Sequence, residues 1–390
     1  MKKLAGAALA LCMATTAAAA QDTHVRIGLM YTLSGPPAAL GEQSRDAFLL
    51  ALEQMGGKLG GKEVVLTIVD DELKPDVAVT RARGLIERDD VHFVIGPIFS
   101  NVAQAIQKPI VDAGRIMISS NAGPSDLAGE QCHPNYFNTA FQNDQVHEVM
   151  GAVAKERGYQ RVFLLTPNYQ AGRDSMAGFK RGFEGGGEII DEVYVPMNQL
   201  DFSGELARIA ALQPDAVFTF MPGGMGVNLV RQYAQAGLTD RVPFLSAFTV
   251  DETNLPAQQA AAQGMYSGAT WTPDMDTPGN AEFVAAFEAK YDRVPALYAM
   301  QAYDTAMLLD AALANVDDLS DVEAVRAALK TAEFPSLRGA FRFNTNQHPV
   351  QNFVLAQVAQ RADGKYQTQF VEEVFTDYGD NYAALCSMSQ

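Results

Sequence analysis

The 390-residue sequence has few of the side chains that most often carry catalysis or hold metal ions. It contains five histidines, three cysteines and one tryptophan. No two histidines have the spacing of metal ligands, and the patterns H-E-x-x-H, C-x-x-C and G-x-S-x-G do not occur. Hydrolases and metalloenzymes need such groups, so we expect a protein that is not an enzyme and that uses no cofactor and no metal.

Positive charge is also scarce. The chain has 29 lysines and arginines against 46 aspartates and glutamates, which gives a formal net charge of −17 at pH 7. Nucleic acids and anionic lipid surfaces attract basic proteins rather than acidic ones. The charge balance therefore argues against a nucleic-acid partner and against binding to an anionic membrane.

Beyond the first twenty residues, no segment is apolar over the roughly 20 residues needed to span a bilayer. The first twenty residues have the pattern of a secretory signal peptide. Lys2 and Lys3 form a basic start, an apolar stretch covers residues 4–13, and small residues lead to Ala20. We therefore predict that residues 1–20 are a signal peptide cleaved near Ala20, and that the mature protein is exported to the periplasm without direct membrane insertion.

Cleavage at Ala20 would change the charge and the cysteine content. It removes two lysines and no acidic residue, so the formal net charge moves from −17 to −19. It also removes Cys12. A lipoprotein signal at Cys12 is an alternative, but Leu11 stands where such a signal has a small residue. Two cysteines remain, Cys132 and Cys386. A pair of cysteines in an exported chain favours one disulfide, and two buried unpaired thiols are the other possibility.

Apolar, strand-like runs alternate with helix-like periods over most of the chain. Each run ends in a short polar or glycine-rich loop that opens a helix. The predicted strands cover residues 25–30, 63–69, 92–95, 116–118, 162–165, 189–195, 216–220 and 244–247, and the predicted helices cover 39–55, 77–87, 102–112, 146–157, 176–183, 205–212 and 227–236. This alternation predicts an α/β fold with parallel sheets. Ligands of such sheets bind at the carboxyl ends of the strands, so the loops there should carry the function.

The pattern changes after about residue 270. Three helices are predicted at 281–290, 299–312 and 322–329, followed by strands at 341–343, 353–358 and 370–375 with a hairpin turn at Asp363-Gly364. The length suggests two domains or lobes, and these last elements are too few to build a third core. We expect them to complete the first two lobes, which requires several crossings of the chain between the lobes.

The loops after the strands carry polar and aromatic side chains. Ser100 and Asn101 open a helix, whose free N–H groups and dipole suit a carboxylate. Ser119, Ser120 and Asn121 end the neighbouring strand. The other candidate residues are Tyr31, Ser34, Phe99, Tyr169, Met221, Phe248 and Trp271. Each of them alone could be a helix cap or a core residue, but together they predict a small-molecule pocket with polar anchors and aromatic walls.

Several segments also follow one another in a familiar order and spacing. They are Ile27-Gly28-Leu29 with Ser34-Gly35, Val94-Ile95-Gly96-Pro97 with Ser100, Ile118-Ser119, Asn168-Tyr169-Gln170-Ala171-Gly172, Pro222-Gly223-Gly224-Met225-Gly226 and Ala302-Tyr303-Asp304-Thr305. Over essentially the whole mature chain, the sequence resembles the periplasmic substrate-binding proteins of branched-chain amino acid type ABC importers.

The resemblance implies the type I periplasmic binding protein fold, in which two Rossmann-like lobes with parallel sheets are joined by a three-strand hinge. The expected N-terminal lobe is residues 21–142 plus 271–345, and the expected C-terminal lobe is 143–270 plus 346–390. The ligand would lie in the cleft, the lobes would close by a hinge motion, and the membrane permease would recognise the closed form. A monomer that performs no chemistry is expected.

Some ligand-binding positions of the family have a matching residue in this sequence, and others do not. Ser100 stands where amino-acid binders hold the ligand carboxylate, and Tyr169 matches a tyrosine that lines the cleft. Asn121, Ala122 and Gly123 match a segment that usually supplies a backbone carbonyl and a threonine hydroxyl, but glycine stands at the threonine position. Phe248 stands where the family has an acidic partner for the ligand ammonium, and Asp251 lies three residues further on.

A buried ammonium without a partner costs several kcal/mol, so a phenylalanine at this position favours an aromatic or apolar ligand. Residues 271–276, the tail around Cys386 and a Cys132–Cys386 bridge also resemble the subgroup that binds aromatic carboxylates. The predicted function is delivery of a small organic acid, an aromatic carboxylate, to an ABC importer. Two alternatives stay open: a branched-chain or aliphatic amino acid binder in which Asp251 holds the ammonium, and a ligand-sensing module that docks a receptor.

Overall fold

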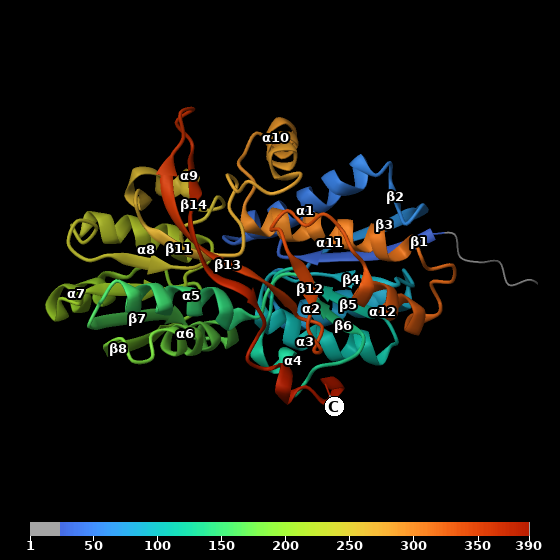
Figure 1. The fold of residues 1–390 in the computed structure, drawn as a ribbon, viewed down its shortest axis with the longest axis horizontal. Coiled ribbons are helices and arrows are strands. Elements are labelled where there is room, and N and C mark those ends of the chain that lie inside the picture. Colours follow the sequence, from blue (N-terminus) through green and yellow to red (C-terminus); the bar gives the residue numbers. More distant parts are fainter. Residues whose placement is uncertain (1–23, 390) are drawn as a thin grey trace, which may run out of the picture.

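Two sheets organise the structure, one in each of two lobes that lie side by side (Figure 1). The computed structural model describes residues 24–389, so the predicted signal peptide and Cys12 lie outside the described residues. None of the helices in this range is long and apolar enough to cross a membrane.

The first sheet has six strands in the order β2-β3-β1-β4-β5-β6. All neighbours are parallel except β2 and β3, and Ile27 in the centre is flanked by Leu66 and Phe93. The strands are β1 (His24–Tyr31), β2 (Lys58–Leu59), β3 (Lys62–Asp70), β4 (Phe93–Ile95), β5 (Ile116–Ser119) and β6 (Tyr136–Asn138).

Seven helices accompany this sheet, and three of them come from late in the sequence. They are α1 (Ala38–Gln54), α2 (Pro75–Glu87), α3 (Ser100–Asp112), α4 (Ser125–Ala128), α10 (Asn280–Tyr291), α11 (Leu297–Leu313) and α12 (Val322–Thr331). Helix α11 is apolar around most of its circumference and is buried along its length, and it lies beside α1 (Figure 1). The late helices therefore complete the first lobe, as the sequence predicted.

The second sheet has eight strands. Its path is β12-β13-β11-β10-β9-β7-β8, and β14 pairs with β13. The strands are β7 (Arg161–Pro167), β8 (Glu188–Val195), β9 (Ala216–Thr219), β10 (Phe244–Ser246), β11 (Tyr266–Ala269), β12 (Phe341–Phe343), β13 (Pro349–Gln360) and β14 (Tyr366–Tyr378). The helices in this part of the chain are α5 (Asn143–Glu156), α6 (Gln170–Gly182), α7 (Ser203–Leu212), α8 (Gly224–Gln235) and α9 (Leu255–Gln258), with 3₁₀ turns at Gln259–Ala262, Ala383–Leu385 and Ser387–Ser389.

Both sheets reverse their strand order at an equivalent place. In the first sheet β3 and β2 lie on one side of β1, whereas β4, β5 and β6 lie on its other side. The strand order therefore reverses between the neighbours β1 and β4. In the second sheet β8 lies on one side of β7, whereas β9, β10 and β11 lie on its other side, so the strand order reverses between β7 and β9. Ligands of open α/β sheets bind at such switch points, outside the carboxyl ends of the strands. The topology therefore places two switch points in one molecule, one in each lobe.

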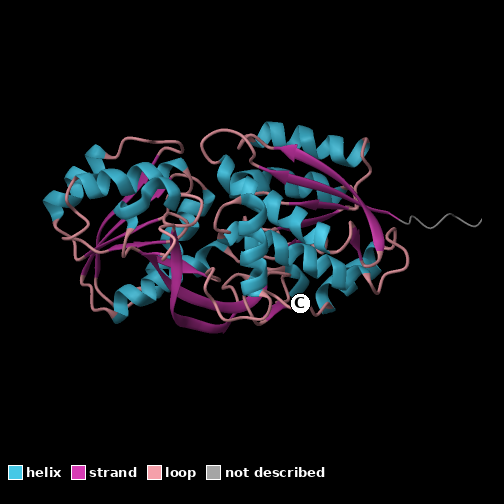
Figure 2. Cartoon of the chain, turned by 90° about the horizontal axis from the view of Figure 1, so that it is seen from above, coloured by secondary structure: helices cyan, strands magenta, loops and turns pink. Residues whose placement is uncertain are grey.

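The two long strands β13 and β14 extend beyond the lengths expected from sequence. Strand β13 begins beside the first lobe, where Asn138 donates its backbone N–H to the carbonyl of Gln347, and it ends in the second lobe paired with β11. Figure 2 shows this ribbon bending across the junction of the lobes. The prediction was too short because polar residues such as Gln351 occupy the part of the strand that lies between the two apolar cores.

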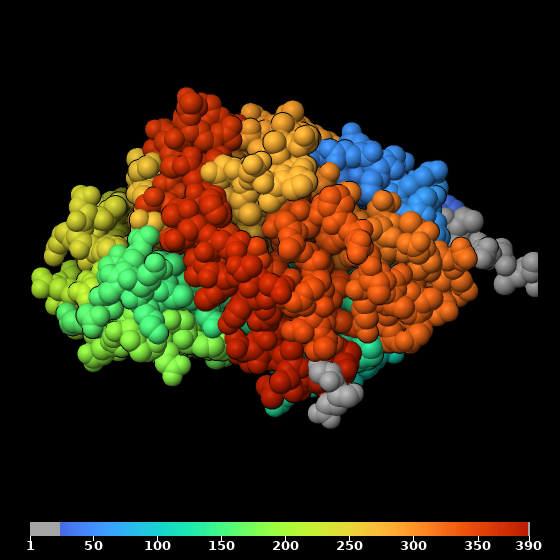
Figure 3. Space-filling view, viewed as in Figure 1, coloured from blue at the N-terminus to red at the C-terminus, as the bar shows by residue number. Residues whose placement is uncertain are grey.

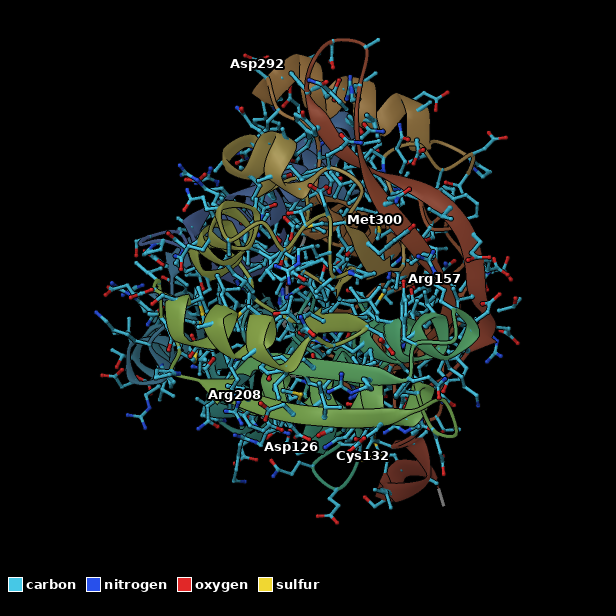
Figure 4. The ribbon with its side chains drawn as sticks, turned by 90° about the vertical axis from the view of Figure 1, so that its left-hand side faces the viewer. Asp126, Cys132, Arg157, Arg208, Asp292 and Met300 are labelled. Carbon is cyan, nitrogen blue, oxygen red and sulfur yellow. A yellow bond between two sulfur atoms is a disulfide. The ribbon has the colours of Figure 1, made fainter. Side chains whose placement is uncertain are left out.

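The chain passes between the lobes after β6, after β11 and along β13, and β14 then returns. Space-filling atoms of the last residues form a continuous band across one face of the molecule (Figure 3). The tail after β14 is fixed to the first lobe by the Cys132–Cys386 disulfide, which confirms the predicted pairing. Cys132 and the tail lie together at the lower edge in Figure 4. The exact lobe boundaries given above stay a prediction.

Candidate ligand-binding cavity

A cavity with about 350 Å³ of empty space, part of it open to solvent, lies between the lobes. Its walls come from loops at the carboxyl ends of β1, β4, β5, β7, β9 and β10, from the start of α5 and from α11. The lining residues are Leu40, Ile98, Phe99, Ser100, Asn121, Ala122, Phe141, Asn143, His147, Tyr169, Ala171, Phe220, Pro222, Phe248 and Tyr298. The cavity therefore contacts both switch points, where open α/β sheets bind their ligands.

Ser100 is held at the cavity by Asn143. The Asn143 side-chain amide donates to Ser100 Oγ at 3.0 Å and to Asp174 Oδ2 at 2.9 Å, while Gly123 N donates to Asn143 Oδ1 at 3.0 Å. These three contacts fix which end of the Asn143 amide faces the serine. Because Ser100 Oγ accepts this hydrogen bond, its own hydrogen is free to be donated to a ligand oxygen.

Asp174 supports this arrangement from the second lobe. It is buried and accepts hydrogen bonds from Ser125 Oγ at 2.7 Å and from Gln170 Nε2 at 2.8 Å, besides the bond from Asn143. Burial, followed by the charge of Asp144, raises the pKa of Asp174 to about 6. Since Ser125 belongs to the first lobe and Asp174 to α6, this carboxylate joins the two lobes next to the cavity.

The cavity has no charged side chain among its lining residues, but two helices begin beside it. Helix α3 begins at Ser100, and α6 begins at Gln170, and neither has a side-chain cap. The first N–H groups of a helix have no acceptor within the helix and carry partial positive charge. Among residues 24–389 there is also no cluster of three or more histidine, cysteine or acidic side chains that could hold a metal ion.

Aromatic rings form the opposite walls. Phe141 and Phe248 stack with ring centroids 5.2 Å apart, and Tyr169 and Phe220 stack at 6.1 Å. Phe248 has a backbone φ of 55°, which is rare for a bulky side chain and costs about 1–2 kcal/mol. The fold thus keeps Phe248 at the cavity despite an unfavourable backbone conformation.

Asp251, the alternative partner for a ligand ammonium, does not line this cavity. Its Oδ1 accepts hydrogen bonds from the backbone N–H and the hydroxyl of Thr253, so the carboxylate stabilises its own loop. Burial raises the pKa of Asp251. Of the two residues that the sequence left undecided, Phe248 is the one at the cavity wall.

The structure brings half of the predicted ligand-binding residues together. The predicted residues that line the cavity are Phe99, Ser100, Asn121, Ala122, Tyr169 and Phe248. The predicted residues that do not line it are Tyr31, Ser34, Asn101, Gly123, Met221 and Trp271.

Each of these last six has another place in the fold. The Tyr31 hydroxyl lies 3.0 Å from Ser120 Oγ inside the first lobe, and Trp271 Nε1 donates to Asn280 Oδ1 at 2.7 Å. Met221 belongs to the apolar core of the second lobe. Gly123 holds Asn143, Asn101 is the second residue of α3, and Ser34 is exposed.

Five lining residues carry polar or aromatic groups that the sequence analysis did not select. They are Phe141, Asn143, His147, Phe220 and Tyr298. Phe141 and Asn143 follow β6, a three-residue strand that was not predicted. The expected helix began only at residue 146, whereas α5 begins at Asn143 after a capping box formed by Gln142 and Gln145. That capping signal would have placed Asn143 at a helix start.

Replacing Ser100 by alanine should weaken binding of the predicted aromatic carboxylate by about 1–3 kcal/mol, or roughly 5- to 150-fold in Kd, because one hydrogen bond to a charged oxygen is lost. Isothermal titration calorimetry measures this directly. Ser34→Ala is the matched control, since it removes the same hydroxyl from an exposed loop outside the cavity. An unchanged Kd for Ser100→Ala would show that the carboxylate does not bind at α3.

Two α/β lobes that enclose an uncharged, partly aromatic cavity at their facing switch points define a two-lobed binding protein for small solutes. Residues 24–365 match the periplasmic binding protein family, and the chain belongs to that family. The predicted fold class and the family resemblance are thereby confirmed.

Individual relatives agree with this assignment. A "Leu/Ile/Val-binding protein homolog 6" of Brucella melitensis is 26% identical over 389 residues, covering 97% of this chain and 98% of that protein. A solute-binding protein of an ABC transporter from R. palustris, solved in complex with benzoate, is 31% identical with a TM-score of 0.88, covering 93% of this chain and 99% of that one. A solute-binding protein from Rhodopseudomonas palustris BisB5 with 3,4-dihydroxybenzoic acid is 28% identical with a TM-score of 0.87, covering 92% and 99%.

Proposed function

We propose that this protein binds an aromatic carboxylate in the cavity between its lobes and delivers it to the membrane permease of an ABC importer. The observation that carries the proposal is the composition of the cavity wall. One side offers a serine hydroxyl and the start of α3, the other offers stacked aromatic rings, and no acidic side chain is available for an ammonium group. The benzoate and dihydroxybenzoate complexes of similar proteins support this ligand class.

In the proposed complex the carboxylate accepts hydrogen bonds from the Ser100 hydroxyl and from the N–H groups at the start of α3. The aromatic ring of the ligand lies against Phe248, Tyr169 and Phe220. The rings supply apolar area and edge or stacking contacts, which suit a planar ligand. The N–H groups supply the positive potential that a carboxylate needs in a site without lysine or arginine.

A branched-chain or aliphatic amino acid is the second candidate, suggested by the names of relatives such as the Brucella protein. Asp251 Oδ2 is buried and has no hydrogen-bond partner, so an ammonium there would satisfy it. Against this candidate, the Ala122 carbonyl already accepts hydrogen bonds from Ser119 Oγ and from Asn138 Nδ2 at 2.9 Å. A carbonyl engaged in this way inside the first lobe is a poor acceptor for a ligand ammonium.

Enclosure of the ligand by residues of both lobes supports a cycle of opening and closing about the crossings near β6, β11 and β13. In this proposal the mature, monomeric protein works in the periplasm after removal of the signal peptide, and the permease recognises its closed form. A receptor-docking sensor would use the same closure. Loss of aromatic-acid uptake in a deletion strain supports transport, whereas intact uptake with a lost response to the acid supports sensing.

A thermal-unfolding screen of the oxidised mature protein tests the ligand class. The panel contains benzoates, hydroxycinnamates, phenylacetates and the twenty amino acids. A ligand at 100 times its Kd stabilises the folded protein by about 2.7 kcal/mol, which gives a measurable increase in Tm. We expect aromatic acids to raise Tm and Asp251→Asn to leave that increase unchanged. Stabilisation by leucine or valine that disappears in Asp251→Asn would identify the amino-acid binder instead.

A further inference from the structure

His147 is a polar side chain in the aromatic part of the cavity. It lies on α5 and lines the cavity, yet it is only 1% exposed. Three phenylalanine rings surround its imidazole, with centroids at 5.8 Å for Phe218, 5.1 Å for Phe220 and 6.3 Å for Phe248. All three rings meet the imidazole at steep angles, so its planar faces and edges are enclosed by apolar groups.

The imidazole lacks hydrogen-bond partners in this surrounding. Nδ1 is buried without a partner, and no hydrogen bond joins either ring nitrogen to any residue in the described part of the chain. A buried polar group without a partner is costly and uncommon in folded proteins, and it calls for a ligand or a water that the protein itself does not supply. Nε2 also makes no hydrogen bond within residues 24–389, but unlike Nδ1 it is not fully buried, so it is the nitrogen that a ligand in the cavity can reach.

His147 lies one helical turn along α5 from Asn143, the residue that holds Ser100. Asn143, which contacts Ser100 Oγ, and His147 are four residues apart on α5 and therefore lie on the same face of the helix. One helical turn advances about 5–6 Å. A ligand held at Ser100 can therefore extend along the cavity wall toward His147.

The protonation state of His147 selects the kind of group it can bind. Burial lowers the pKa of His147 to about 3, so the imidazole is neutral at physiological pH. A neutral imidazole presents either a donor or an acceptor at Nε2, depending on its tautomer. A hydroxyl group both donates and accepts, so it pairs with either tautomer, whereas a carboxylate only accepts.

We infer that His147 forms a second polar subsite that hydrogen-bonds a ring hydroxyl, so that the protein prefers hydroxylated aromatic acids over unsubstituted ones. This inference rests on the proposed function and adds the substituent that the ligand carries. His147 then determines specificity from the end of the cavity opposite the carboxylate site, and the aromatic rings around it exclude water from the new hydrogen bond.

Titration calorimetry with benzoate, 3-hydroxybenzoate and 4-hydroxybenzoate tests the inference on the full mature chain. We expect the unaltered protein to bind at least one hydroxybenzoate about 10-fold or more tightly than benzoate. His147→Phe, which keeps an aromatic ring, should lose this preference, so that its Kd values for benzoate and for the hydroxybenzoates become similar. His147→Gln keeps a donor and an acceptor, so it should retain part of the preference and provides a second variant if His147→Phe does not fold.

Phe141→Leu is the matched control, since Phe141 lines the cavity and stacks on Phe248 rather than on His147, and it should weaken benzoate and hydroxybenzoates alike. The inference is overturned if the unaltered protein shows no preference, or if His147→Phe retains the preference or weakens all three acids equally. If the unaltered protein binds none of the three acids but binds an amino acid, both the proposed function and this inference are wrong. Binding of benzoate without any preference contradicts this inference alone.

Discussion

Replacing Phe248 by aspartate should reduce the affinity for benzoate by about 100-fold beyond the loss caused by removing the ring. The new carboxylate would enter a cavity that has no cationic side chain to balance it. Two like charges about 6 Å apart repel by about 3 kcal/mol at an effective dielectric constant of about 20, which corresponds to this factor in Kd. Titration calorimetry at pH 8, where the aspartate is ionised, measures the effect.

Phe248→Asn isolates the charge, because asparagine has the shape of aspartate and both residues tolerate the positive φ of 55° at this position. The asparagine variant should lose only the contacts of the ring, which are its buried apolar area and about 0.5–1.5 kcal/mol of ring pairing. The difference between the two variants should shrink at lower pH, since a protonated aspartate no longer repels the ligand. Equal affinities of the two variants at pH 8 would mean that no ligand carboxylate lies within reach of this wall.

Replacing Arg338 by methionine should lower the free energy of unfolding by about 3–5 kcal/mol. Arg338 and Asp304 form an ion pair at 3.1 Å in which both side chains are 0% exposed. Arg338 also donates to the Ala140 carbonyl at 3.0 Å and to Gln351 Oε1 at 2.9 Å, so it joins α11 to two of the crossings between the lobes. Removing one partner leaves the other charge buried and uncompensated, which is the costly step. Urea unfolding with the disulfide intact measures the change.

The chain offers an exposed ion pair as a control. Arg342 contacts Asp377 at 3.0 Å with side chains 59% and 64% exposed, and Arg342→Met should cost less than about 1 kcal/mol. Combining Arg338→Met with Asp304→Asn should recover part of the stability, because the double variant leaves no unpaired charge. Equal midpoints for Arg338→Met and Arg342→Met would refute the structural role assigned to Arg338.

The candidate site shows where prediction from sequence succeeded and where it failed. Ser100 and Phe99 were found because they follow a short apolar strand and open a helix, which is a local signal. Tyr31 and Met221 also lie at the carboxyl ends of strands, but their side chains belong to the cores of the lobes. Position after a strand therefore identifies the correct edge of a sheet, but it does not decide which side chains turn toward the cavity.

The residues that were missed depend on contacts between distant parts of the chain. Asn143 and His147 face the cavity because α5 packs against the second sheet directly after the chain leaves the first. Tyr298 reaches the cavity from α11, which packs against α1 over 250 residues away in sequence. No local pattern carries this information, since it depends on how the lobes are joined.

The sequence by itself determined the α/β class, the two-lobed architecture, the single disulfide and the segments that supply the site, because strand and helix periodicity, cysteine count and loop position are local properties of the chain. The tertiary structure decided the rest. Which of Phe248 and Asp251 faces the cavity, how Asp174 and Asn143 orient Ser100, and why His147 lacks a partner all depend on side chains from both lobes meeting at one place. Burial and hydrogen bonding between distant residues arise only when the chain has folded.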